Sequence, residues 1–178
     1  MYCGCNPIAL SSQTELSRTL IRLMTQKAYS SITVSELCRE SGVSRQTFYS
    51  LFRSMDNVVV FTLRERVCSL PHETAEAAPT PEQLCRCYSR YICTNREFLK
   101  LLVENDVGYL LDRSIYETLS GCPGAFPEPL RDYAAQFLAG GLTGVVRQYC
   151  AQDPPPSEET LFAILYALLR GVYREGTG

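Results

Sequence analysis

The 178-residue sequence has no tryptophan, a single histidine and no apolar run long enough to cross a membrane. A transmembrane helix needs about 20 consecutive apolar residues. The least polar stretch, residues 137–146, is shorter and contains three glycines. The N-terminus has no basic segment followed by an apolar one, so no secretory signal is expected. These absences predict a soluble, cytoplasmic protein.

Strand patterns and catalytic motifs are also missing. No segment shows the alternation of apolar and polar residues, or the hairpin turns, that indicate β-strands. There is no glycine-rich phosphate loop, no H-E-x-x-H and no G-x-S-x-G. Cys68 and His72 lie four residues apart, but Pro71 interrupts the helix between them and no third group would orient the pair. We therefore expect an all-α protein that is not an enzyme and uses no cofactor.

Nine cysteines are many for this length, but their spacing does not match a zinc site. Structural zinc sites use C-x-x-C pairs and histidines, whereas Cys3–Cys5 and Cys85–Cys87 are C-x-C pairs. In a reducing compartment such residues are free thiols rather than disulfides. We interpret them as small apolar side chains with no metal bound. A thiol sensor or a soft-metal site is the alternative.

Charge is distributed unevenly along the chain. The net charge of −2, taken alone, argues against a nucleic-acid partner. Residues 1–66, however, hold eight basic and five acidic residues, so this part carries +3 and the remainder −5. A basic N-terminal third on an acidic body gives modest support to an anionic partner for the first part.

Helix start and stop signals divide the N-terminal third into four helices. Capping boxes begin at Ser12 and at Thr33. Gly42 suits a left-handed exit from the second helix. Ser44 and Ser54 can cap a third and a fourth helix.

Helical spacing continues after a change in composition. Residues 71–81 are rich in Ala, Pro, Thr and Glu, and we interpret them as the connection between two parts. Thr80, followed by Pro81 and by Gln83, is a strong helix start. Further helices are expected at 84–94, 97–104, 108–119, 130–149 and 157–174.

Residues 33–53 show a short helix, a turn with glycine and a second short helix, which is the helix-turn-helix plan. Polar residues lie at the start and outer face of the second helix, where such motifs meet base edges and phosphates. Arg and Gln have the donor geometry for guanine and adenine edges. Thr and Tyr hydroxyls suit phosphates. The candidate DNA-binding residues of this helix are Ser44, Arg45, Gln46, Thr47 and Tyr49.

This segment resembles the N-terminal domain of TetR/AcrR-family transcriptional regulators, over about residues 12–65. The shared features are Thr33 opening the second helix, Gly42-Val43-Ser44 at the turn, and the aromatic motif of residues 47–52. Residues 137–149 resemble, more loosely, the two-glycine dimer helix of a subgroup that contains regulators of dihydroxyacetone-kinase operons. The resemblance implies a bacterial, homodimeric, sequence-specific regulator that binds double-stranded operator DNA and is tuned by a small-molecule effector.

The resemblance also implies two domains, a DNA-binding one at 1–66 and a helical regulatory and dimerisation one at 67–178. It adds Thr33 to the candidate DNA-binding residues. One position departs from the family pattern, because Met55 stands where a lysine usually opens the fourth helix and contacts a phosphate. Arg53 is the candidate to supply that contact.

Loss of the phosphate contact at Met55 would favour an alternative function, namely a ligand- or thiol-responsive helical binding protein with weak or lost DNA affinity. A protein-interaction adaptor is a third possibility. The sequence does not distinguish a repressor from an activator.

Glycines in the helix expected at 130–149 predict a dimer interface. Each glycine costs a helix about 1 kcal/mol relative to alanine, so several together suggest that another helix approaches closely. With the leucines of the last helix, this helix from two chains would form a four-helix bundle about a two-fold axis. The alternative is that both are one chain's core helices. The candidate interface residues are Phe137, Gly140, Gly141, Gly144, Val145, Leu161, Leu165 and Leu168.

An aromatic-rich set lies between these two parts. Such a set can line an apolar cavity whose hydroxyls orient a ligand, although it is more often plain core. The sequence does not identify the ligand. The candidate pocket residues are Tyr88, Tyr91, Ile92, Phe98, Leu102, Tyr109 and Tyr116.

Overall fold

The computed structural model describes residues 6–68, 80–121 and 127–173. These residues form nine α-helices, one 3-10 turn at Tyr29–Ser31 and no strand, which confirms the all-α fold class. The helices are α1 (Pro7–Met24), α2 (Val34–Ser41), α3 (Arg45–Leu51), α4 (Met55–Cys68), α5 (Pro81–Thr94), α6 (Arg96–Glu104), α7 (Gly108–Ser120), α8 (Arg131–Ala151) and α9 (Glu158–Tyr173).

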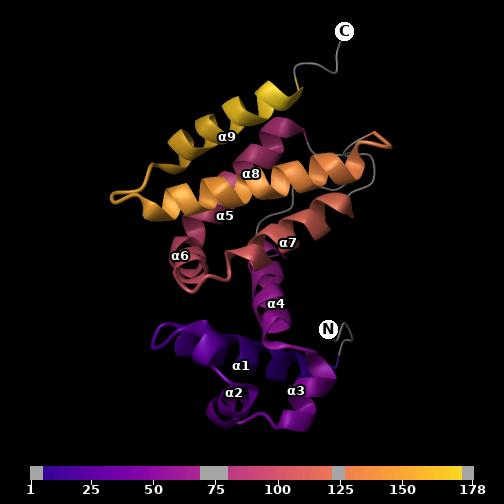
Figure 1. Ribbon diagram of the computed structural model, residues 1–178, viewed down its shortest axis with the longest axis vertical. Helices are drawn as coiled ribbons and strands as arrows, with labels where there is room; N and C mark the ends of the chain where they lie inside the picture. The colour runs from indigo at the N-terminus through magenta and orange to yellow at the C-terminus, as the bar shows by residue number, and fades with distance from the viewer. Residues whose placement is uncertain (1–5, 69–79, 122–126, 174–178) are drawn as a thin grey trace.

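The helices form two groups joined by α4. Figure 1 shows α1, α2 and α3 together at one end of the molecule and α5 to α9 at the other, with α4 running between them. Helix α4 contacts α1 in the first group and α7 in the second. The boundary predicted at residue 66 therefore falls inside a continuous helix, and the division into 1–66 and 67–178 stays a prediction.

The composition of α4 explains how it can join both groups. Val58, Val59, Val60, Phe61 and Leu63 are all buried, so apolar side chains occur on every side of this helix. A helix that is apolar all round must be covered all round. The packing of α1 on one part of α4 and α7 on the other provides that cover.

The first helix begins earlier than the sequence predicted. The Asn6 side chain accepts a hydrogen bond from the N–H of Ile8 at 3.0 Å, and Pro7 occupies the first helical position. The capping box predicted at Ser12 is wrong, because that segment lies inside α1 and the Thr14 hydroxyl donates to the Leu10 carbonyl oxygen. An Asn cap followed by proline starts a helix as effectively as a box does.

The other predicted helix ends are confirmed. Thr33 and Ser44 accept capping bonds from the N–H groups of the third helical residues, at 3.2 and 3.0 Å. Gly42 ends α2 with φ 69°, where a side chain would be strained. Thr80 forms the full capping box with Gln83. The N-terminal group is thus defined by local signals.

Candidate nucleic-acid interface

Helix α3 is held against the rest of the N-terminal group by aromatic side chains. Phe48 is completely buried and Phe52 is almost so. The Phe52 ring lies 6.2 Å from that of Phe48 and 5.6 Å from that of Phe61 on α4, measured between centroids. These ring contacts hold one face of α3 against the core, so the opposite face of the helix points outward.

The outward face of α3 is polar and exposed. Arg45, Gln46 and Tyr49 are exposed, with Tyr49 at 54%. The Tyr49 ring lies edge-on to the Phe48 ring, with 5.2 Å between their centroids. The structure therefore brings the predicted residues of α3 together on one surface.

Ser44 and Thr47 have a different role from the three exposed side chains. The Ser44 hydroxyl caps α3 and also lies 2.9 Å from the Thr47 hydroxyl. Thr33 caps α2 in the same way. Three of the predicted DNA-binding hydroxyls thus stabilise helix starts in this structure, and any contact they make with a phosphate is additional.

Arginines of the N-terminal group differ in whether a carboxylate pairs with them. Arg22 pairs with Glu40 at 3.2 Å, and Arg39 pairs with the same carboxylate group at 3.4 Å. Among the residues that the structure describes, Arg45 and Arg53 are in no ion pair. A guanidinium without an internal carboxylate partner can bind an external anion without first giving up an ion pair.

Met55 occupies the first position of α4, and its side chain is half-buried against the core. The Ser54 hydroxyl caps this helix by accepting from the N–H of Asn57 at 3.3 Å. A thioether offers no charge to a phosphate. Met55 therefore makes an apolar contact with the core at the position where the family pattern has a lysine that contacts a phosphate.

A polar junction between the two groups was not predicted from the sequence. The hydroxyls of Tyr29 and Tyr109 donate to the two oxygens of the Asp56 carboxylate, at 2.6 and 3.0 Å. The Tyr29 N–H donates to the Asn105 side-chain oxygen at 2.7 Å. Burial, and then the bond to Asp56, raise the pKa of the Tyr29 hydroxyl above its ordinary value. Tyr29 and Asn105 are 76 residues apart, so no local pattern could have paired them.

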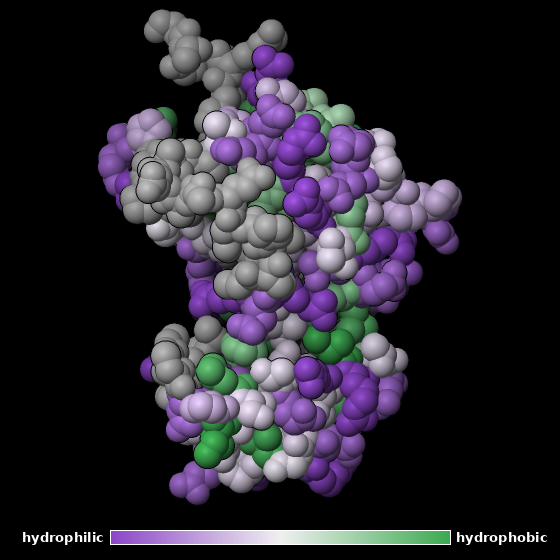
Figure 2. Space-filling model, turned by 180° about the vertical axis from the view of Figure 1, so that it is seen from behind, coloured by the Kyte–Doolittle hydropathy of each residue, from purple (hydrophilic) through white to green (hydrophobic). Residues whose placement is uncertain are grey.

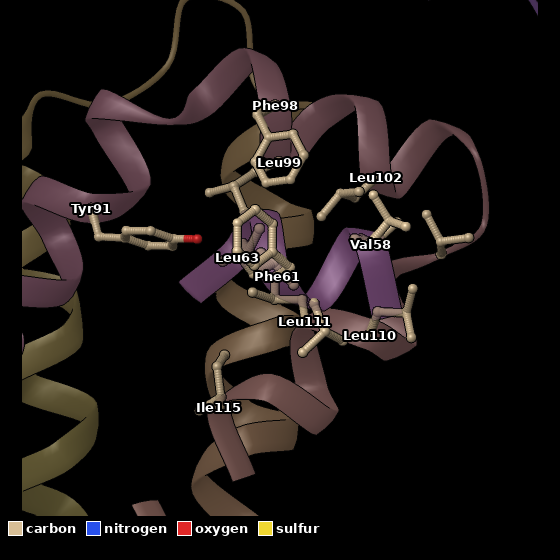
Figure 3. Close-up of a cluster of buried hydrophobic side chains, with 14 of the residues drawn as sticks. Val58, Phe61, Leu63, Tyr91, Phe98, Leu99, Leu102, Leu110, Leu111 and Ile115 are labelled. Atoms are coloured by element: carbon tan, nitrogen blue, oxygen red, sulfur yellow. The ribbon is translucent and has the colours of Figure 1, made fainter. Parts of the chain in front are cut away.

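The seven predicted pocket residues do not line one cavity. Tyr91, Ile92, Phe98 and Leu102 are at most 5% exposed and belong to the core; Figure 3 shows three of them among side chains of α4, α6 and α7. Of the seven, only Phe98 lines the larger cavity described below, and only Tyr88 lines a small apolar one between α5, α7, α8 and α9.

The remaining two predicted pocket residues lie elsewhere. Tyr109 is 51% exposed and belongs to the junction with Asp56, and Tyr116 is partly buried against the core. The expected aromatic pocket is therefore corrected to a packed core plus a junction. These aromatic residues recur at helical spacing because they lie on buried helix faces. Residues that line a pocket wall on a helix would show the same spacing.

The predicted dimer residues divide into exposed and buried ones. Phe137 and Leu168 are 65% and 56% exposed, and Gly140, Gly141 and Gly144 are also exposed. Val145 is half-buried in the chain's own core. Leu161 and Leu165 are at most 3% exposed and pack inside the chain, so the interface assignment is corrected for these two.

Other apolar side chains on the same two helices are exposed and were not predicted. Tyr133 is 80% exposed and Ile164 is 42% exposed. Figure 1 shows α8 and α9 crossing the body, while Figure 2 shows that the opposite side of the body is mostly hydrophilic where it is coloured. Together with Phe137 and Leu168, these residues form what we call the α8–α9 face. Their four-residue helical spacing is the signal that could have identified them.

Five cysteines lie in the described part with their side chains, and all are free thiols: Cys38, Cys85, Cys87, Cys93 and Cys150. Of these, Cys87 alone is exposed. In the same part of the chain no group of three His, Cys, Asp or Glu residues could hold a metal ion. His72, Cys3 and Cys5 lie outside the described residues, as does the Cys68 side chain.

None of the helices described has the length and apolar character needed to cross a membrane.

The sequence of the N-terminal group and the fold of the whole chain both resemble known proteins. Residues 18–60 match the family model of bacterial regulatory proteins, tetR family. The fold is similar to that of Lin0861 from Listeria innocua, with a TM-score of 0.76 and 15% identity over 97% of this chain and 96% of that one. No curated protein matches the sequence.

Two further solved structures are similar over 90% of this chain and 94% of theirs, each with a TM-score of 0.56. They are the dihydroxyacetone kinase operon activator DhaS, at 16% identity, and a TetR transcriptional regulator from Streptococcus agalactiae 2603V, at 19%. At these identities the likeness establishes the shared fold.

Proposed function

The chain belongs to the TetR family of bacterial regulatory proteins through its N-terminal domain, and from this premise we propose that it is a homodimeric, sequence-specific regulator of transcription. In this proposal α3 contacts the bases of DNA, a second copy of the chain binds the α8–α9 face, and a small molecule controls DNA binding. The alternative function is a ligand- or thiol-responsive binding protein with weak or lost DNA affinity, and Met55 is the one feature that motivates it.

The observation that carries the proposal is the exposed polar face of α3. Arg45 and Gln46 are at its N-terminal end, where a recognition helix contacts base edges in the major groove. Arg45 has no ion-pair partner among the described residues, so its guanidinium can contact a guanine edge without first breaking an internal bond.

Selection of fragments of the parent genome's DNA by the purified protein tests this function. We expect recovery of related sequences with two half-sites, since a two-fold dimer reads a palindrome. The Arg45→Ala variant should recover a broader set. The matched control is Arg90→Ala on α5, which removes an arginine whose side chain is 53% exposed and far from α3 in the chain. Recovery of random fragments by the unaltered protein would contradict specific binding.

Support for the dimer comes from the α8–α9 face. Large apolar side chains at 42–80% exposure on neighbouring helices are unusual for a monomer and are typical of interfaces. A symmetric pair buries the same face on both copies. Glycines on that face allow close approach of the second copy, because a Cβ built at Gly141 or Gly144 meets no atom within 4 Å.

A further inference from the structure

A cleft of about 730 Å³ lies where the N-terminal group meets the body. Its walls come from the end of α1, from Arg66 on α4, and from the junction of α5 with α6. In Figure 1, α6 lies above the end of α1 that contributes to this cleft. The volume is within the range of small-molecule sites. The cleft differs from the core in Figure 3, which is filled by apolar side chains.

Three cationic side chains line the cleft, and two of them are held in place by the surrounding structure. The Arg66 guanidinium donates to the Asn95 side-chain oxygen at 2.9 Å and lies 4.4 Å from the centre of the Phe98 ring. Arg96 donates to the Gln152 carbonyl oxygen at 3.0 Å. Lys100 follows one turn later on α6. Side chains positioned in advance lose little entropy when a ligand binds.

The two carboxylates of the cleft lie further into solvent than the cations they pair with. Glu97 is 84% exposed against 20% for Arg96, and Glu104 is 58% exposed against 41% for Lys100. The inner wall is therefore cationic. The Nε atom of Arg96 is buried and has no hydrogen-bond partner among the described residues. An unpaired buried donor of this kind is costly unless an acceptor reaches it.

The start of α6 adds to the positive potential of the cleft. Asn95 precedes α6 but makes no capping bond with its side chain. Its amide group is used elsewhere, accepting from Arg66 and donating to the Tyr91 carbonyl oxygen. The N-terminus of a helix carries a partial positive charge, which favours an anion near the first turn.

We propose that this cleft binds a small organic anion bearing carboxylate or phosphate groups, and that this anion is the effector of DNA binding. The proposal rests on the regulator function proposed above. The anionic groups contact Arg96 and Lys100, while Ile21, Met24 and Leu101 of the lining contact the carbon skeleton. Because the lining joins α1 and α4 to α6, the bound anion favours the arrangement in which these helices converge.

The site is tested without DNA, by calorimetric unfolding of the full chain with inorganic phosphate and with succinate, at constant ionic strength against chloride. At about ten times the dissociation constant, a bound anion should raise Tm by roughly 3–6 °C. Arg96→Gln and Lys100→Gln should each lose most of this rise. Arg90→Gln, which removes an arginine on α5 that pairs with Glu158, should keep it.

The proposal of an anion site is overturned if neither probe raises Tm beyond chloride, or if the rise is the same in Arg96→Gln and Lys100→Gln as in Arg90→Gln. Lys100 makes only a surface ion pair with Glu104, so Lys100→Gln is expected to fold normally and keeps the test decisive.

The effector role is tested by operator affinity with and without the stabilising probe. We expect a change of at least about fivefold that disappears in Lys100→Gln. An unchanged affinity would contradict the effector role. A protein that binds no DNA without the probe, and none with it, would instead contradict the proposed regulator function, while the calorimetric result would still decide the anion site.

Discussion

Helix α3 of the N-terminal group and helix α8 of the body expose different kinds of side chain on their free faces. Helix α3 buries Phe48 and exposes Arg45, Gln46 and Tyr49, so its free face is polar and cationic. Helix α8 buries Leu138 and exposes Tyr133 and Phe137, so its free face carries large apolar side chains. A polar face with an unpaired arginine suits a hydrated, anionic surface such as DNA. An apolar face is stable only when another apolar face covers it.

The largest expected effect comes from replacing a phenylalanine by alanine in each of the two groups. Phe48→Ala removes a fully buried ring and should lower the free energy of unfolding by about 3–5 kcal/mol. Phe137→Ala removes a ring that is 65% exposed and should change it by less than about 0.5 kcal/mol when the protein is dilute enough to be monomeric. Denaturant titrations of both variants measure the difference. Equal losses would remove the contrast between the two faces.

Gly141→Leu should separate the two copies with little effect on the single chain. A Cβ at this position meets no atom within 4 Å and the residue is exposed, so a side chain can leave the backbone here without a clash at Cβ, and leucine gains helix propensity. Across a two-fold axis the same side chain would meet its copy and weaken the dimer, by about 2 kcal/mol or more if it lies at the interface centre. Sedimentation at several concentrations measures this. An unchanged dimer would show that Gly141 lies outside the interface.

The two groups also differ in how well the sequence predicted them. The ends of α2 and α3 follow from Thr33, Gly42 and Ser44, because a cap is a contact between neighbours in the sequence. The outward face of α3 follows from the spacing of the residues that α3 buries. The start of α1 was placed too late because two start signals, Asn6 with Pro7 and the Ser12 box, compete within a few residues.

In the body, long-range packing determines which apolar residues are free. Leu165 and Leu168 have the same chemistry and lie on α9, which packs against α5, yet the first is 3% exposed and the second 56%. The aromatic pocket failed for the same reason, since Tyr91 and Tyr109 differ only in what packs over them. The cleft at Arg96 depends on α1, α4 and α6 meeting, and no spacing within one helix encodes that meeting.

Substitutions on α3 should affect DNA binding alone. Arg45→Ala or Gln46→Ala should each cost about 1–3 kcal/mol of operator affinity and relax the preference at one position per half-site. Tyr49→Phe removes only a hydroxyl suited to phosphate, so it should weaken operator and scrambled DNA alike. Binding isotherms on both duplexes separate these results. If all three variants bind like the unaltered protein, α3 is not the reading surface.

The junction between the groups should make stability sensitive to alkaline pH. The pKa of the Tyr29 hydroxyl is raised in the folded chain, by burial and by the bond to Asp56. Its stabilising bond is therefore fully present below the ordinary tyrosine pKa of about 10. It is lost as pH rises further, because the unfolded chain releases the proton first.

Tyr29→Phe should reduce the decline in unfolding free energy above about pH 10. At neutral pH it should cost about 1.5–3 kcal/mol, the net value of one hydrogen bond to a charged group. Tyr133→Phe is the control, since that side chain is 80% exposed on α8. A Tyr29→Phe variant with the alkaline profile of the unaltered protein would mean that the junction does not hold its proton on folding.

The smallest expected change is a gain of DNA affinity at the position that departs from the family pattern. Met55 opens α4 and is half-buried, so Met55→Lys gives up part of an apolar contact in the N-terminal group and places an ammonium near the DNA backbone. If α4 begins at a phosphate, the new charge releases about one more counterion, and the salt slope of log K steepens by about 0.9 units for any duplex.

The gain in affinity should be modest, because Arg53 already supplies a charge close by. Arg53 is exposed and is in no ion pair within the described part of the chain. Binding isotherms at several salt concentrations measure the slope. Gln83→Lys at the start of α5 adds the same charge to the body, and there the slope should stay unchanged. An equal slope in Met55→Lys and Gln83→Lys would place the start of α4 away from the DNA.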